Sequence, residues 1–420
     1  MWYQQPAYID CSAVVVCSGY STFTKAVRIQ TSTTIAPFGG PVGDVAVDTK
    51  TLAESQESSL KEAGFTLVSE PPTGERYLVY SDRTWFTPHL LTCLKQAGTG
   101  RLLVTDERWN AWTGVLQDLE RPGLYEIGIR DGGEPGFDDL EPVAIDLEFR
   151  DLEFEPLHAS MKHAAHHPVR VGPAMVHQMD HWSHIVRVNQ LVLAARMEDA
   201  RHDWETAGFF RKLWILLTIF MKSRSLDGWK IASALTERGK DISIRPTAVV
   251  EFSILEDGCD IGPHTVIRGS IIGAGAKVDS HATVTGSVVG PGSKVGKYAF
   301  LNLCTLFPNA MVSCGDGFQA SVFGVDSFVA WGCTILDLSF GRSIKVERDG
   351  PGTERVDTEQ HFLGAAIGHR AKIGHGVKIG YGVTVPNDAL LVDGSDFLRT
   401  WADAPVGEAV VLKDGRPVKP

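Results

Sequence analysis

A 17-residue repeat between Ile244 and Leu390 constrains the fold more than any other feature of this sequence. Each unit contains three aliphatic or aromatic residues, at successive steps of six, six and five. The first column of the repeat contains Leu255, Ile272, Val289, Leu306 and Phe323. An amphipathic helix needs an apolar period near 3.6, which these steps do not fit. Repeats of fixed length build solenoids, in which each unit buries its apolar side against the next.

Small residues mark the corners of the predicted turns. Four positions after the first apolar mark, each unit contains a small residue. This second column contains Cys259, Ala276, Ser293, Ala310 and Ser327. Glycine follows several of the marks, as at Gly262 and Gly273, because a sharp corner favours a residue without a Cβ atom. Spacing and corners together predict a parallel β-helix with three short strands in each turn.

Short strings at these corners resemble the hexapeptide repeat of left-handed β-helix acyltransferases. The strings are Ile261-Gly262-Pro263, Ile272-Gly273-Ala274, Val289-Gly290-Pro291, Ile367-Gly368-His369 and Ile373-Gly374-His375. The resemblance implies a left-handed coil, which is an exception to the usual handedness of parallel crossovers. It also implies a homotrimer with sites between neighbouring subunits, and an acyl-CoA such as acetyl-CoA as the donor.

Overall charge narrows the range of partners. The chain has 420 residues, a formal net charge of −11 and a sequence pI of about 5.7. Nucleic-acid-binding proteins usually carry a basic surface, so we expect no nucleic-acid partner. Seven scattered cysteines indicate reduced thiols. The N-terminus has no basic region followed by an apolar core, so we expect no signal peptide and a cytoplasmic protein.

The most apolar stretch of the chain is Phe209–Met221. A membrane span needs about 20 apolar residues, and this stretch is shorter and interrupted by Arg211 and Lys212. We therefore predict no membrane span and interpret the stretch as a buried or interfacial helix. Attachment to a membrane surface is the alternative, because Lys222 and Arg224 follow directly.

The sequence pattern of the first 160 residues predicts an α/β sheet. Buried strands are predicted at residues 13–17, 77–80 and 102–105, with a helix at 90–96. Alternation of this kind places ligands at the carboxyl ends of the strands.

The segment Tyr77–Leu91 resembles the strand, aspartate, loop and helix of sugar-phosphate nucleotidyltransferases. The resemblance implies that Asp82 helps to hold Mg²⁺ beside nucleotide phosphates. The family's Gly-rich, Arg-containing phosphate loop is missing, since residues 17–25 contain one glycine and no arginine. Lys25 is the only counterpart of the family's catalytic lysine. The domain is therefore either degenerate or a divergent active enzyme, and Asp82 could equally be a turn or N-cap residue.

Histidines are concentrated in the predicted linker, between His158 and His184. In a helix, His177, His181 and His184 would share one face, and Asp180 could complete a metal site. A polar helix face packed between domains is the alternative. The stretch from Val176 to Asn189 resembles the helix that joins a nucleotidyltransferase-like domain to a β-helix in certain bifunctional proteins.

The repeat also contains a column of aromatic residues and one carboxylate in a column of small residues. The register stacks His264, His281 and Tyr298 in a ladder, which is either an ordinary exposed stack or one wall of a groove between subunits. Asp316 falls in a column of small residues, where burial of its charge would be costly. A local bulge at Cys314–Gly317 is therefore expected to move Asp316 outward.

The repeat is interrupted by an insertion at residues 341–360. Loops that leave a rigid coil often carry function, so this segment is the candidate site of the β-helix. Its basic residues could bind phosphates of coenzyme A or of a nucleotide sugar. They are Arg342, Lys345, Arg348 and Arg355. Acyl transfer needs a base that titrates near neutral pH, and His361 or His369 is the candidate.

These inferences combine into one predicted architecture. An α/β nucleotidyltransferase-like domain (1–160) precedes a helical linker (161–240), a left-handed parallel β-helix of 17-residue coils (241–392) and a C-terminal cap (393–420). The whole resembles bifunctional N-acetylglucosamine-1-phosphate uridyltransferase/glucosamine-1-phosphate acetyltransferases. The resemblance implies acyl transfer to a sugar phosphate or nucleotide sugar, with nucleotidyl transfer by the front domain if that domain binds Mg²⁺. A non-catalytic trimeric binding or scaffold protein is the alternative.

Overall fold

The computed structural model describes most of the chain. The described residues are 9–10, 23–152, 169–224, 227–350, 352–392, 411–413 and 416–418. The strand predicted at residues 13–17, and the histidines between His158 and His167, lie outside these ranges. Within the described ranges, no helix is both long and apolar enough to cross a bilayer.

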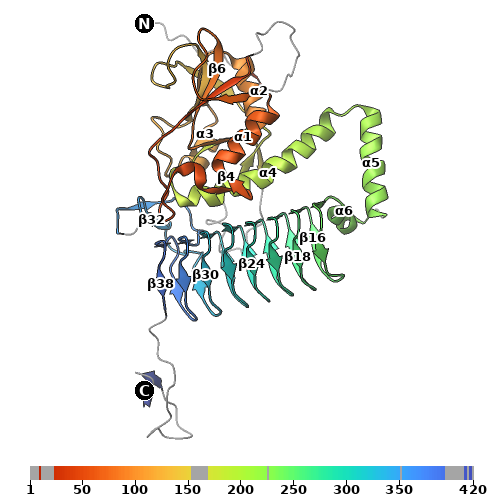
Figure 1. Cartoon of the computed structure of the whole chain (residues 1–420), viewed down its shortest axis with the longest axis vertical. Helices are drawn as coiled ribbons and strands as arrows, with labels where there is room; N and C mark the ends of the chain where they lie inside the picture. Colours follow the sequence, from red (N-terminus) through yellow and green to blue (C-terminus); the bar gives the residue numbers. More distant parts are fainter. Residues whose placement is uncertain are drawn as a thin grey trace.

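A seven-stranded sheet forms the front domain, coloured red to orange in Figure 1. In spatial order its strands are β1 (Ile9–Asp10), β10 (Pro142–Asp146), β8 (Gly100–Val104), β9 (Leu124–Asp131), β6 (Arg76–Ser81), β2 (Lys25–Ile29) and β5 (Thr66–Val68). β9 runs antiparallel to both of its neighbours, and the other pairs are parallel. The predicted α/β class is confirmed, and the parallel strands end at one common edge.

Helices and short strands complete this domain. They are α1 (Leu52–Glu62), α2 (Pro88–Ala97), α3 (Glu107–Thr113), the 3₁₀ helix η1 (Val42–Asp44), β3 (Ala46–Val47), β4 (Lys50–Thr51), β7 (Thr84–Phe86) and β11 (Arg150–Leu152). Lys25, considered above as a phosphate-loop residue, instead begins strand β2. Its amine forms an ion pair with Glu75 at 2.7 Å. The side chains of Ala26 and Val27 in the same strand are buried in the core.

The linker contains two short strands and three helices. They are β12 (Val169–Val171), β13 (Val176–Gln178), α4 (Trp182–Thr206), α5 (Phe209–Ser223) and α6 (Gly228–Ala234). α4 ends at Thr206 and α5 begins at Phe209, so the apolar stretch Phe209–Met221 lies in a helix of its own. α6, and not α5, contacts the first coil of the solenoid, where Phe252 N donates to Ala232 O at 3.1 Å.

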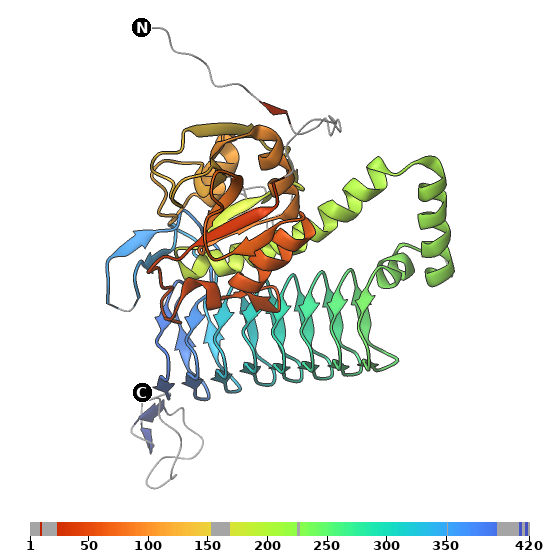
Figure 2. The ribbon, with the colours of Figure 1, turned by 45° about the horizontal axis from the view of Figure 1, so that its top comes forward.

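The second half of the chain is a stack of parallel strands in three sheets (Figure 2). The first sheet contains β14 (Glu237–Arg238), β17 (Ile254–Leu255), β20 (Ile271–Ile272), β23 (Val288–Val289), β26 (Thr305–Leu306), β29 (Val322–Phe323), β34 (Ala366–Ile367) and β37 (Thr384–Val385). The second sheet contains β15 (Ser243–Ile244), β18 (Asp260–Ile261), β21 (Lys277–Val278), β24 (Lys294–Val295), β27 (Met311–Val312), β30 (Phe328–Val329), β35 (Lys372–Ile373) and β38 (Leu390–Leu391). The third sheet contains β16 (Val249–Glu251), β19 (Val266–Arg268), β22 (Thr283–Thr285), β25 (Phe300–Asn302) and β28 (Gly317–Gln319), and beyond it β31 (Thr334–Ile335) pairs with β36 (Lys378–Ile379).

The register of these sheets follows the apolar columns of the sequence. In the first sheet Leu255 pairs with Ile272, and Ile272 pairs with Val289. The first column and the small residues Cys259, Ala276 and Ala310 are buried and belong to one core cluster along the stack. The predicted parallel β-helix, with apolar columns pointing inward, is therefore confirmed.

The outward side of the first sheet joins the solenoid to the front domain. Its outward residues Ile271, Val288 and Val322 are completely buried, and they belong to the same core cluster as the front domain. On the second sheet the outward positions are partly or fully exposed, and several of them are charged, as at Lys277 and Lys294. α4 runs between the front domain and the solenoid (Figure 1). The two halves therefore share one apolar core.

Asn189 is a polar centre of this contact. Its Nδ2 lies 3.2 Å from Ala46 O, 3.0 Å from Ile185 O and 3.1 Å from Thr305 Oγ1. Its Oδ1 accepts a hydrogen bond from Asp48 N at 2.7 Å. One buried amide thus joins the β3–β4 turn, helix α4 and strand β26.

The insertion forms an antiparallel hairpin, β32 (Lys345–Glu347) and β33 (Arg355–Asp357). Ile344 and Val346 are completely buried and join the core of the front domain. His181 Nε2 also lies 3.2 Å from Glu347 O. The hairpin is therefore packed against the front domain. A second hairpin pairs β39 (Val411–Lys413) with β40 (Arg416–Val418).

The bulge predicted to move Asp316 outward is wrong. β25 and β28 pair regularly, with Phe300 opposite Gly317, and the Asp316 side chain is only 3% exposed. Its Oδ1 accepts from Gly332 N at 2.7 Å, and its Oδ2 has no hydrogen-bond partner among the described residues. Burial raises the pKa of Asp316 to about 6. The corner accommodates the carboxyl group because burial favours its neutral form.

Candidate functional site

The edge of the front sheet where ligands would be expected is occupied by the protein's own contacts. Asp82 follows β6 and is 3% exposed. Its Oδ2 accepts from Thr31 N at 3.0 Å, and its Oδ1 accepts from Thr31 Oγ1 at 2.8 Å. Both oxygens thus anchor the segment that follows β2. These residues do not fit a magnesium site, because Mg²⁺ needs carboxylate oxygens directed at an open coordination sphere.

A second charged group at this edge also holds the structure together. Arg83 contacts Glu126 at 2.6 Å and Asp180 at 2.7 Å. Burial acts to raise the pKa of Glu126, but hydrogen bonds and charge from Arg83 outweigh it and lower that pKa. Burial raises the pKa of Asp180 in spite of the same arginine. This group fastens the linker to the β6–β7 turn.

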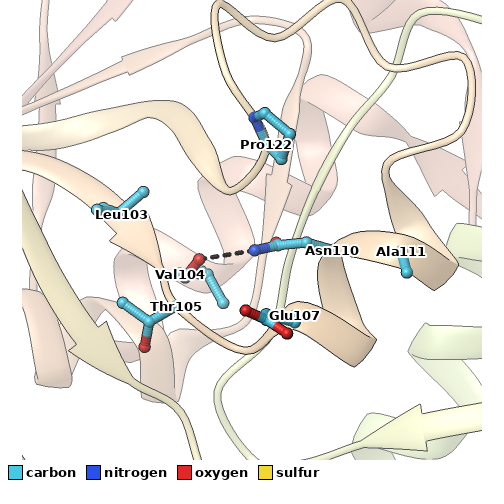
Figure 3. A pocket seen from close by; sticks show the side chains of 7 residues that line it. All are labelled: Leu103, Val104, Thr105, Glu107, Asn110, Ala111 and Pro122. Atoms are coloured by element: carbon cyan, nitrogen blue, oxygen red, sulfur yellow. Dashed lines mark hydrogen bonds between the residues drawn. The ribbon is translucent and has the colours of Figure 1, made fainter.

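An open depression of about 460 Å³ lies near the carboxyl end of β8 (Figure 3). It is lined by Leu103, Val104, Thr105, Glu107, Asn110, Ala111 and Pro122. The Asn110 side chain donates to Val104 O at 2.8 Å, as the dashed line shows. The lining is mostly apolar, with one carboxylate and no basic residue. It therefore does not suit the phosphates of a nucleotide.

The linker histidines form a buried cluster. His177 lies in β13, and His181 is the N-cap of α4, so the predicted common helical face is wrong. The rings of His177 and His184 are 4.8 Å apart. Burial lowers the pKa of His177 to about 3 and that of His181 to about 4.

His184 is held in one tautomer. Its Nδ1 accepts from Asp180 N at 3.1 Å, and its Nε2 lies 2.9 Å from Val115 O. Since a carbonyl oxygen can only accept, Nε2 carries the proton. Both ring nitrogens are engaged, and no group of three or more His, Cys, Asp or Glu among the described residues could hold a metal ion. The cluster packs the linker.

His369 is also part of the domain contact. Its ring centroid lies 5.1 Å from that of Phe38 and 5.6 Å from that of Phe307. Its Nδ1 accepts from Val325 N at 2.8 Å, and burial lowers the pKa of the ring. Asn387 Nδ2 donates to Phe38 O at 2.8 Å beside it. The ring thus packs between Phe38 of the front domain and Phe307 of the solenoid.

Polar groups of three segments meet where the insertion leaves the solenoid. His361 Nδ1 lies 3.2 Å from Ser339 O, and Ser339 N donates to His361 O at 2.9 Å. Ser339 Oγ donates to Arg342 O at 2.6 Å. Gln319 Nε2 donates to Asp337 Oδ2 at 2.5 Å. We call these five residues the insertion base, meaning the place where the inserted hairpin joins the solenoid and not a chemical base.

The hydrogen bond at Nδ1 of His361 is compatible with a role of this residue as a general base. In the neutral ring, a carbonyl acceptor at Nδ1 selects the tautomer with its proton on Nδ1 and the lone pair on Nε2. The ring is half-buried, and Arg342 beside it is exposed. Of the predicted site residues, His361 and Arg342 are thus both hydrogen-bonded to Ser339, Arg342 through its backbone oxygen.

The other predicted basic residues lie on the hairpin. Lys345 is opposite Asp357, and Arg355 is opposite Glu347. Directly opposite residues share one face of a hairpin, so two of the predicted cations face carboxylates. Burial and the positive charge of Arg348 both lower the pKa of His181. These cations form a mixed-charge surface rather than a single anion site.

The predicted aromatic ladder is confirmed. The rings of His264 and His281 are stacked with centroids 4.8 Å apart, and those of His281 and Tyr298 are stacked at the same distance. Further along the corner, Trp331 packs on His375 at 5.2 Å. The ring faces are occupied by one another, so the ladder stabilises the corner and offers a ligand mainly ring edges.

No protein-family model matches this chain, and no curated protein sequence matches it significantly. We therefore infer function from the geometry of the insertion base. Sequence reasoning missed Ser339 and Asp337 at this base, although both immediately precede the interruption of the repeat. It also missed the hydrogen bonds that make Asn189 a junction. No local pattern indicated them, because Asp48, Ala46 and Thr305 are distant from Asn189 in sequence.

Proposed function

We propose that the chain is an acyltransferase that acts at the insertion base and uses an acyl-CoA donor such as acetyl-CoA. The acceptor is the hydroxyl or amine of a sugar phosphate or nucleotide sugar. The observation that supports this proposal is the half-buried His361, with Nδ1 directed at Ser339 O and the exposed Arg342 nearby. The proposal includes a left-handed coil and a homotrimer, in which a neighbouring subunit completes the site.

The chemistry assigned to these residues is simple. Nε2 of His361 takes the proton of the acceptor as the acceptor atom bonds to the thioester carbon. The C–S bond breaks, and the coenzyme A thiolate leaves and is then protonated. Arg342 supplies a positive charge for a phosphate of the donor or acceptor. A positioned base of this kind contributes about 10²- to 10⁴-fold to the rate.

In this proposal the front domain is a structural support and not a nucleotidyltransferase. Asp82 is engaged by Thr31, and the depression beside β8 has no basic residue. These contacts also support a second candidate function, a non-catalytic binding or scaffold protein. In that case His361 would be an ordinary surface residue of the solenoid.

The first experiment is calorimetric titration with acetyl-CoA, followed by a thiol-release assay with amino and phosphorylated sugars. We expect acetyl-CoA binding that is weakened by Arg342→Ala, and turnover reduced at least 100-fold by His361→Gln. His264→Gln is the matched control, because it changes a histidine of the ladder and should leave turnover unchanged. UTP with Mg²⁺ should give no heat.

The outcome separates the two candidates. No acetyl-CoA binding and no thiol release with any acceptor would favour the scaffold. Magnesium-dependent UTP binding that is lost in Asp82→Ala would contradict the structural role of the front domain. Light scattering of the purified chain measures the number of subunits, and a stable monomer would contradict a site shared between subunits.

A further inference from the structure

Helix α5 carries an extensive exposed apolar surface. Its exposed large side chains include Phe210 at 83%, Phe209 at 75% and Trp214 at 66%. The full set is Phe209, Phe210, Leu213, Trp214, Leu216, Leu217, Phe220 and Met221. We call these eight side chains the α5 face. Single exposed apolar residues are ordinary on proteins, but a contiguous group of this size marks an interaction surface.

The eight residues share one side of the helix. At 100° per residue they fall within an arc centred near Leu217, while Ile215 and Ile219 lie on the opposite side and are half-buried. α6 packs against α5 and contacts the first coil, so it accounts for the covered side. Figures 1 and 2 both show α5 as the outermost element beyond this end of the solenoid.

Charge distinguishes this segment from the rest of the chain. Residues 209–224 contain Arg211, Lys212, Lys222 and Arg224 and no acidic residue. The whole chain nevertheless has a net charge of −11. α5 is thus both a strongly apolar surface helix and a concentrated positive segment on an acidic protein. Basic residues on the polar side and Trp, Phe and Leu on the other are typical of helices that lie in a membrane interface.

We propose that α5 binds a lipid surface that contains anionic headgroups, lying in the plane of the interface. The α5 face enters the boundary between headgroups and acyl chains, and the basic residues contact the anionic headgroups. The helix has only 15 residues, and this placement needs no span. The proposal is independent of acyl transfer at the insertion base.

A second copy of the chain is a weaker fit to the same surface. A symmetric dimer brings the same patch of both copies together. It would therefore bring two positive segments into one contact.

The orientation follows from the fold. α5 lies at the first-coil end of the solenoid, and the hairpin β32–β33 lies at the opposite end in Figures 1 and 2. With α5 on a bilayer, the solenoid holds the insertion base away from the membrane surface. The anchor and the proposed active site then occupy opposite ends of one rigid element.

Vesicle flotation of the full chain tests the proposal. The vesicles are phosphatidylcholine alone, or phosphatidylcholine with 30% phosphatidylglycerol, a proportion of about one in three chosen to give a clear surface charge. We expect flotation with the anionic vesicles, and at least tenfold less in high salt because the electrostatic attraction is screened. Phe210→Ser with Leu217→Ser should abolish flotation. Both side chains are exposed, so the fold should persist, as circular dichroism can verify.

Matched variants separate the contributions of the α5 face and of the basic residues to vesicle binding. Phe340→Ser changes a phenylalanine that is 73% exposed far along the chain and should float normally. Lys222→Gln with Arg224→Asn should reduce binding to anionic vesicles while leaving the α5 face intact. Asn is chosen because residue 224 has a left-handed backbone, with φ of 48°.

Two results would overturn the proposal. One is absence of flotation with anionic vesicles at low salt. The other is a concentration-dependent rise in mass by light scattering that the Phe210→Ser, Leu217→Ser variant abolishes, with no vesicle binding. That second result would assign the α5 face to a second copy of the chain.

Discussion

Asn189 offers the most direct test of how the two halves are joined. Asn189→Leu keeps a side chain of similar size but removes the hydrogen bonds to Asp48 N, Ala46 O and Thr305 Oγ1. Asp48 and Ala46 are both less than a tenth exposed, so water does not readily replace the lost partner. A buried polar group without a partner costs about 1–3 kcal/mol, and two backbone groups are affected. We expect the free energy of unfolding to fall by about 2–5 kcal/mol.

Urea unfolding followed by tryptophan fluorescence measures this loss. Because multidomain chains need not unfold in one step, the front domain and the solenoid should be fitted as separate transitions where two appear. Gln190→Leu is the matched control, as the same chemical change at the next, half-buried position of α4. It should alter stability by no more than about 0.5 kcal/mol. Equal effects of the two substitutions would refute the role of Asn189 as a junction.

Three further predictions follow from buried groups. Because burial lowers the folded-state pKa values of His177 to about 3 and His181 to about 4, the unfolded chain binds more protons below pH 6.5. The free energy of unfolding should thus fall by about 1.4 kcal/mol per histidine per pH unit between pH 6 and 4, and a flat profile would contradict this. The contribution of Asp316 to the pH dependence of stability has the opposite sign. Because its pKa is raised to about 6, stability is lost as pH rises towards and past 6. Asp316→Asn should therefore stabilise the chain more at pH 8 than at pH 4, as thermal melts would show. Phe38→Ala should cost about 3–5 kcal/mol in urea unfolding, because a buried ring stacked on Phe307 at 4.9 Å is lost, and a smaller loss than Leu67→Ala would argue against tight docking.

The solenoid could be predicted from sequence because its side-chain pattern is local and repeats. Every coil carries the same inward marks, and Leu255 and Ile272 report the same environment one turn apart. The docking side of the first sheet was visible in the same pattern, since Ile271 and Val288 are apolar at outward positions. Outward apolar residues on successive coils, as at Ile271 and Val288, indicate a covered surface, whereas the outward apolar residue Phe328 of the second sheet is exposed.

The front domain was harder to predict because its central strands mix charged and apolar residues. β2 contains Lys25 and Arg28, which conceal the short buried stretch between them. Asp82 was correctly placed at the end of a strand, but its partner Thr31 is distant in sequence. The prediction for Asp316 was wrong because it assumed a charged carboxylate, whereas the neutral acid can be buried at the corner.

The shared core along the first sheet also limits how the chain can change in length. Front-domain contacts reach from Ile271 to Ala366 on successive coils. One additional coil within this stretch would displace every later contact by about 4.8 Å and separate the insertion hairpin from its seat on the front domain. An additional coil ahead of Ile254 would move only α6 and the end of the linker. Insertions and deletions of whole repeats should therefore be tolerated near α6 and selected against where the front domain rests.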